Sequence, residues 1–82
     1  MRTRLLTPLG ALIIAVRSND RTQAASHLAD FNTVANDILP KIDKDVSKPA
    51  NALHSAITNV RTHPGDVAAL EEDRRQLLAA IP

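Results

Sequence analysis

Apolar side chains between residues 28 and 60 recur mostly at steps of three, four or seven residues. This spacing places them along one side of an α-helix. The intervening positions hold mainly Asp, Lys, Asn, Ser, Thr and Ala, so the opposite side is polar. The members of this apolar stripe are Leu28, Phe31, Val34, Ile38, Ile42, Val46, Leu53, Ile57 and Val60. Because water disfavours such a surface, the stripe must be buried against another helix, an apolar ligand or an apolar surface.

A chain of 82 residues forms at most one small domain. Phe31 is its single aromatic residue, and Trp, Tyr and Cys are absent, so aliphatic side chains must build the core without help from disulfides. The sequence contains no alternation of apolar and polar residues that would indicate a β-strand. We therefore predict an all-α fold, a small bundle of three to four short amphipathic helices, with marginal stability.

Prolines divide the expected helices. Thr22 can cap a helix that runs to Leu39 and ends or kinks at Pro40, after which a short helical stretch over 41–46 continues the stripe. Pro49 is acceptable near the start of the next helix, which carries the stripe to about residue 61. The segment 63–66 breaks the chain, and Pro64 opens a last helix with Asp66 at its positive end. The inner face of this last helix consists of Val67, Leu70, Leu77, Leu78 and Ile81.

The first 24 residues allow two interpretations. Arg2 and Arg4 precede an apolar run over 5–16, which is the layout of a secretory signal and is too short for a membrane-spanning helix. Cleavage after Ala24 would leave a helical domain of residues 25–82. Alternatively, the run is a first core helix with Thr7 as its N-cap and Pro8 in its first turn. The first interpretation implies secretion, and the second a cytoplasmic protein.

The charge distribution argues against a nucleic-acid partner. The formal net charge is +1, and residues 25–82 mix six basic side chains with eight acidic ones. Neutralising phosphates requires a concentrated positive surface, which this pattern does not provide.

The sequence offers no recognisable catalytic, metal or cofactor site. His27, His54 and His63 are not paired at metal-ligand spacing, and the run 43–45 lacks the glycine and distal glutamate of a calcium loop. His27 and Asp30 can face each other one helical turn apart, and His63 fits the turn before Pro64. We assign the acidic run 71–73 to the outside of the last helix, where Glu71 can pair with arginines one turn later. An enzyme is not expected.

Two stretches resemble the hydrophobic surface-binding protein A family of fungi. The first stretch contains Asn36-Asp37-Ile38, Ile42-Asp43-Lys44-Asp45-Val46, Pro49-Ala50-Asn51-Ala52-Leu53 and Ala56-Ile57-Thr58. The second contains Gly65-Asp66-Val67-Ala68-Ala69-Leu70 and Leu77-Leu78-Ala79-Ala80-Ile81. The match covers about residues 30–81 and corresponds to the first part of a longer family domain. The resemblance implies a small secreted helical protein of the fungal cell wall that adsorbs to hydrophobic surfaces or lipids and helps to recruit a secreted esterase.

We therefore expect a non-catalytic secreted protein that binds a hydrophobic surface or lipid without a cofactor. The expected apolar contacts are Phe31, Ile38, Ile42, Val46, Leu53 and Ile57. The alternative is a cytoplasmic helical adaptor or regulator, in which residues 5–16 belong to the core and the stripe forms a homodimer or docks on a partner protein.

Overall fold

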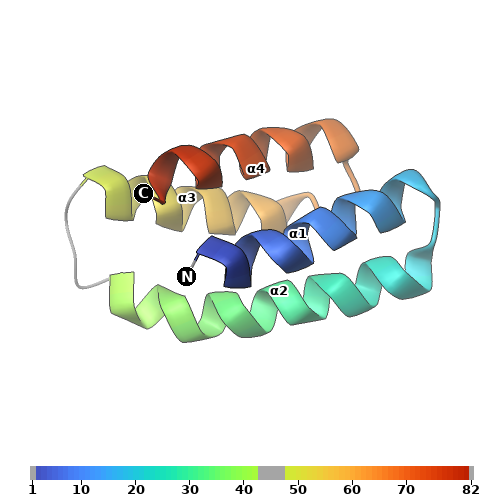
Figure 1. The fold of residues 1–82 in the computed structure, drawn as a ribbon, viewed down its shortest axis with the longest axis horizontal. Helices are drawn as coiled ribbons and strands as arrows, with labels where there is room; N and C mark the ends of the chain where they lie inside the picture. Colours follow the sequence, from blue (N-terminus) through green and yellow to red (C-terminus); the bar gives the residue numbers. More distant parts are fainter. Residues whose placement is uncertain (1, 43–47, 82) are drawn as a thin grey trace.

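The computed structural model describes residues 2–42 and 48–81, which form the helices α1 (Arg2–Arg17), α2 (Arg21–Ile42), α3 (Lys48–Thr62) and α4 (Val67–Ala80). The predicted all-α bundle is confirmed. Consecutive helices run in opposite directions, and the bundle measures 38 × 21 × 20 Å (Figure 1). The α1–α2 turn and the α3–α4 turn lie at one end, which we call the tip end. The end of α2 and the start of α3 lie at the other end.

Two helical hairpins, α1–α2 and α3–α4, make up the bundle. The helices pack most extensively within each hairpin, and the hairpins meet where α1 contacts α4 and, least extensively, where α2 contacts α3. The core between them is aliphatic apart from Phe31. Its largest fully buried side chains are Phe31, Leu5, Leu9, Leu12, Ile57, Leu70, Leu77 and Val60. Thus α1 supplies core residues as α2, α3 and α4 do.

The predicted helix start at Thr7 and Pro8 is wrong, because both residues lie inside α1. Of the two outcomes predicted for Pro40, the end of the helix does not occur, because Pro40 lies inside α2, which continues to Ile42. A proline inside a helix removes one backbone donor. Here Leu5 and Leu9 on α1, and Ile38 and Ile42 on α2, are buried on either side of the proline. Their burial favours the continuous helix despite the missing donor. Residues 43–46 of the predicted short helix lie outside the described residues.

The starts of the helices α2, α3 and α4 follow known preferences for residues at helix amino ends. Pro49 is the second residue of α3, as predicted. Asp66 caps α4 by accepting a hydrogen bond from the Ala69 backbone N–H (3.2 Å), whereas Pro64 belongs to the preceding turn. For α2, Asp20 rather than Thr22 provides the cap, because its carboxylate accepts from the Gln23 N–H at 3.0 Å.

The α1–α2 turn is fixed by a Schellman motif. The Asp20 N–H donates to the Ala15 carbonyl (2.9 Å) and the Asn19 N–H donates to the Val16 carbonyl (3.1 Å). Asn19 has φ = 56°, the left-handed conformation that this position requires. Asparagine tolerates that conformation better than most residues with a Cβ atom. Asp20 then caps α2 at once, so the reversal of the chain takes only three residues.

We predict opposite effects for two substitutions of Asn19. Asn19→Gly should keep or slightly raise the free energy of unfolding, because glycine adopts positive φ without steric cost. Asn19→Val should lower it by about 1–2 kcal/mol, because a β-branched side chain is strained there. Urea denaturation followed by circular dichroism measures both. Equal stability of the two variants would contradict the role assigned to this turn.

Candidate apolar binding site

The structure brings together the described members of the predicted contact set. Phe31, Ile38 and Ile42 on α2 and Leu53 and Ile57 on α3 all belong to the core, and none is more than 8% exposed. Val46 lies outside the described residues. These side chains pack with the inner faces of α1 and α4 instead of forming a stripe on the surface. Contact with an external apolar phase therefore requires the hairpins to separate.

A cleft of about 310 Å³ lies at the tip end, between the turn of one hairpin and the turn of the other. The α1–α2 hairpin provides most of its walls, and the α3–α4 turn closes one side. Its lining residues are Leu12, Ala15, Val16, Asn19, Asp20, Arg21, Ala24, Ala25, Leu28, Pro64 and Gly65. Leu12 lines the cleft and is also a fully buried core residue. The cleft therefore reaches from the surface to the aliphatic core.

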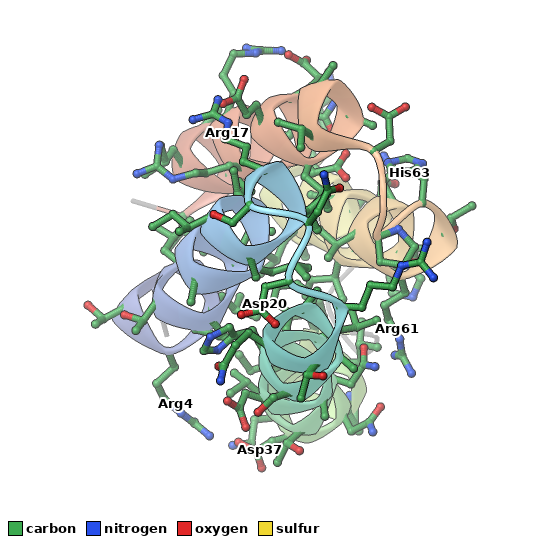
Figure 2. All side chains as sticks on the ribbon, turned by 90° about the vertical axis from the view of Figure 1, so that its right-hand side faces the viewer. Arg4, Arg17, Asp20, Asp37, Arg61 and His63 are labelled. Carbon is green, nitrogen blue, oxygen red and sulfur yellow. The ribbon has the colours of Figure 1, made fainter. Side chains whose placement is uncertain are left out.

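Polar pairs within each hairpin tie its two helices together. Arg4 on α1 donates to Asp37 on α2 at 3.1 Å, and Figure 2 shows both side chains on the same side of the bundle. Arg4, with help from Lys41, holds the pKa of the Asp37 carboxyl below its usual value. On the other hairpin, Asn59 of α3 donates to Gln76 of α4 at 3.5 Å.

The pair Arg17–Glu71 joins one hairpin to the other. Arg17 ends α1 at the tip end and donates to Glu71 in the second turn of α4. Figure 2 shows Arg17 beside α4 in the view onto the tip end. The two side chains are 56% and 49% exposed, so water and salt screen the attraction between them. Glu71 was expected to pair within α4, but that pairing occurs instead between Glu72 and Arg75.

The assignment of the whole acidic run 71–73 to the outside of α4 is wrong at Asp73, which is buried. Its side chain is only 4% exposed and accepts a hydrogen bond from Nε2 of His63 at 2.9 Å. Leu70, Asp73 and Leu77 are spaced by three and four residues, which puts Asp73 on the buried side of α4. His63 lies in the turn before Pro64, as predicted, and links that turn to α4. The spacing could have revealed Asp73, because it follows the same rule as the apolar residues.

The remaining ionisable groups in the described part of the chain include one further His–Asp pair. His27 and Asp30 face each other on α2, as predicted, with Nδ1 and Oδ2 3.9 Å apart. Within the described parts of the chain, no cluster of three or more His, Asp or Glu side chains could hold a metal ion. Among the described helices, none is long and apolar enough to cross a membrane.

Searches against protein-family models, curated proteins and solved structures found no match for this chain.

We predict that His63 stabilises the bundle because it is the partner of a buried carboxylate. His63→Ala should lower the free energy of unfolding by about 1–3 kcal/mol, since Asp73 would keep its burial and lose its hydrogen bond. Asp73→Leu should lower the free energy of unfolding much less, because an apolar residue suits a position on the buried side of α4 beside Leu70 and Leu77. Chemical denaturation of both single variants and the double variant measures the coupling between the two side chains.

His27→Ala is the matched control, because the His27 side chain is about as exposed as that of His63 (30% and 36%), whereas its partner Asp30 is 68% exposed and Asp73 only 4%. This substitution should change the free energy of unfolding by no more than about 0.5 kcal/mol. If His63→Ala were as mild as this control, the pair would not stabilise the α3–α4 hairpin.

Proposed function

We propose that this chain is a non-catalytic protein that binds hydrophobic surfaces or lipids by separating its two helical hairpins at the tip end. The observation that carries the proposal is the tip cleft, which leads from the surface to an aliphatic core between the hairpins. The end of α2 and the start of α3 lie at the opposite end (Figure 1). Opening from the tip end would present both inner faces to one apolar phase.

The distribution of polar pairs supports this direction of opening. Arg4–Asp37, Asn59–Gln76 and His63–Asp73 stay within a hairpin and would persist as the hairpins separate. Arg17–Glu71 crosses between them and is exposed on both sides. An exposed ion pair contributes at most about 1 kcal/mol, so it is a weak restraint. The hairpins can therefore move apart as units.

Burial energies determine where opening is favourable. In water, each 100 Å² of apolar surface exposed by opening costs about 2.5 kcal/mol, which keeps the bundle closed. Contact of the same surface with oil, wax or acyl chains removes this cost. On α2, the Asn32 side-chain oxygen is buried without a hydrogen-bond partner among the described residues. Such an unsatisfied acceptor costs about 1–3 kcal/mol, which lowers the stability of the closed form.

A covalent link between the hairpins tests the mechanism. The chain has no native cysteine, so Arg17→Cys with Glu71→Cys provides two unique thiols for a short bismaleimide. The link would hold the two hairpins together at the tip end. We expect adsorption to polystyrene beads or an oil emulsion to fall at least tenfold after cross-linking. Depletion of the protein from solution measures adsorption.

Arg4→Cys with Asp37→Cys is the matched control. Its side chains are 55% and 47% exposed, close to those of the test pair, but it links α1 to α2 within one hairpin. Adsorption should survive this link. Equal adsorption by both cross-linked proteins would show that the hairpins need not separate, and the proposal would be wrong.

A second form of the proposal replaces hairpin opening. It combines secretion, residues 25–82 as the mature chain, and membership of the fungal surface-binding family, with a secreted esterase as a candidate partner at the cell wall. Removal of residues 1–24 would take away α1 and uncover the faces of α2 and α4 that it contacts. Phe31 on α2 and Leu70 on α4 are fully buried when residues 1–24 are present. The mature chain would then expose apolar surface without any opening.

A cytoplasmic helical adaptor is the second candidate, and the packing of α1 favours it. Leu5, Leu9 and Leu12 are buried as completely as the core residues of the other helices. Intact mass spectrometry of the protein from its native source separates the two candidates. A mass that begins at Ala25 in secreted material supports surface binding by the mature chain and overturns hairpin opening, whereas an intact Met1 start inside the cell supports the adaptor.

A further inference from the structure

The polar and apolar residues that line the tip cleft are separated from each other. Residues 19–21 are consecutive at the α1–α2 turn and exposed, and we call them the polar rim, whereas every other lining residue is apolar or glycine. Leu12 lies seven residues before the rim and Leu28 seven residues after it, so each leucine is about two helical turns, roughly 10 Å, from the rim. A molecule with a polar head and an apolar tail matches this division.

The polar rim carries one negative and one positive side chain that do not pair with each other. Asp20 uses its Oδ1 atom to accept a hydrogen bond from the Gln23 backbone N–H. Arg21 forms no ion pair with any described residue. Both charges can therefore interact with a ligand at the mouth of the cleft.

Other charged side chains at the tip end do not line the cleft. Arg17 and His63 each pair with an acidic residue of α4, and Asp66 caps that helix. Arg61 ends α3 outside the lining, and Figure 2 shows it at the tip end beside the start of α2. The head of a molecule bound in the cleft would thus meet the two rim charges first.

We propose that the tip cleft binds one single-chain amphiphile with a zwitterionic phosphocholine head. The inference rests on the proposed function, because it names the class of lipid that the same cleft recognises. A head of one sign would be attracted by one rim charge and repelled by the other. In a phosphocholine head, the phosphate can face Arg21 while the quaternary ammonium faces Asp20, so both rim charges are complemented.

The size and walls of the cleft agree with a single tail. Its volume of about 310 Å³ is close to the lower limit of ligand-binding cavities, about 300 Å³, which suits one alkyl chain rather than two. Val16 and Ala24 line the cleft between the rim and the two leucines. A tail that passes them contacts Leu12, which also belongs to the core.

Titration of the full chain with three amphiphiles of equal tail length tests the choice of head. They are dodecylphosphocholine, laurate and dodecyltrimethylammonium, each kept below its critical micelle concentration so that single molecules bind. Amide chemical shifts of Ala24 and Gly65 in NMR spectra report occupancy of the cleft. We expect the dissociation constant of dodecylphosphocholine to be at least tenfold lower than those of the other two.

Two charge variants should change this preference in opposite directions. Asp20→Asn removes the negative charge but keeps a good capping side chain, so it should weaken dodecylphosphocholine at least threefold and strengthen laurate. Arg21→Gln should weaken dodecylphosphocholine by a similar factor and strengthen dodecyltrimethylammonium. A purely structural role of either residue would weaken all three amphiphiles alike.

Filling the cleft tests its location. Ala25 and Ala29 are exposed alanines one helical turn apart on α2, and Ala25 lines the cleft whereas Ala29 does not. Ala25→Leu should weaken dodecylphosphocholine at least tenfold, and Ala29→Leu should leave its dissociation constant unchanged. Circular dichroism should show the same helicity for both variants.

Equal affinity for the three amphiphiles, tightest binding of laurate or dodecyltrimethylammonium, or equal effects of Ala25→Leu and Ala29→Leu would overturn this proposal. Hairpin opening is decided separately, by the adsorption of the cross-linked proteins to polystyrene or oil. Selective binding of dodecylphosphocholine by a chain whose adsorption survives the Arg17→Cys/Glu71→Cys link would support the ligand of the cleft and overturn hairpin opening alone.

Discussion

Burial of aliphatic side chains between two helical hairpins is the interaction on which the rest of the structure depends. Leucine, isoleucine, valine and alanine fill the core around one phenylalanine, and each helix contributes at least one fully buried side chain. Nothing in such a core is directional, because hydrophobic burial depends on area rather than on orientation. Helix ends, turns and polar pairs must therefore define the arrangement, and they do so mainly within each hairpin.

The polar interactions divide into two kinds according to their burial. His63–Asp73 connects a turn to the helix after it, and the burial of Asp73 makes its hydrogen bond costly to lose. Arg17–Glu71 and Arg4–Asp37 are exposed and contribute little to stability. The first kind holds one hairpin in shape. The second guides how helices align, and Arg17–Glu71 does so between hairpins that could separate on an apolar phase.

Local patterns predicted the fold class, the position of Pro49 and the place of Asp66 at the amino end of α4, because each depends on a few neighbouring residues. They placed the start of α1 wrongly at Pro8 and did not decide whether α2 ends or continues at Pro40. At both prolines, tertiary packing on either side favours a continuous helix. Local patterns also failed at Asp73, because acidic residues are seldom buried and the sequence alone did not reveal that His63 would reach it. The tip cleft was beyond prediction, since it arises where two turns distant in sequence come together.

The three-residue reversal at Asn19 also affects how the chain reaches this structure. Because α1 and α2 are joined by so short a turn, their mutual contacts begin between residues close in sequence at the tip. They then extend along the hairpin to pairs such as Arg4 and Asp37, which are 33 residues apart. Chains dominated by local contacts fold fast. We expect the α1–α2 hairpin to form as a unit before it meets α3–α4, so that the final step of folding is the docking of two preformed halves.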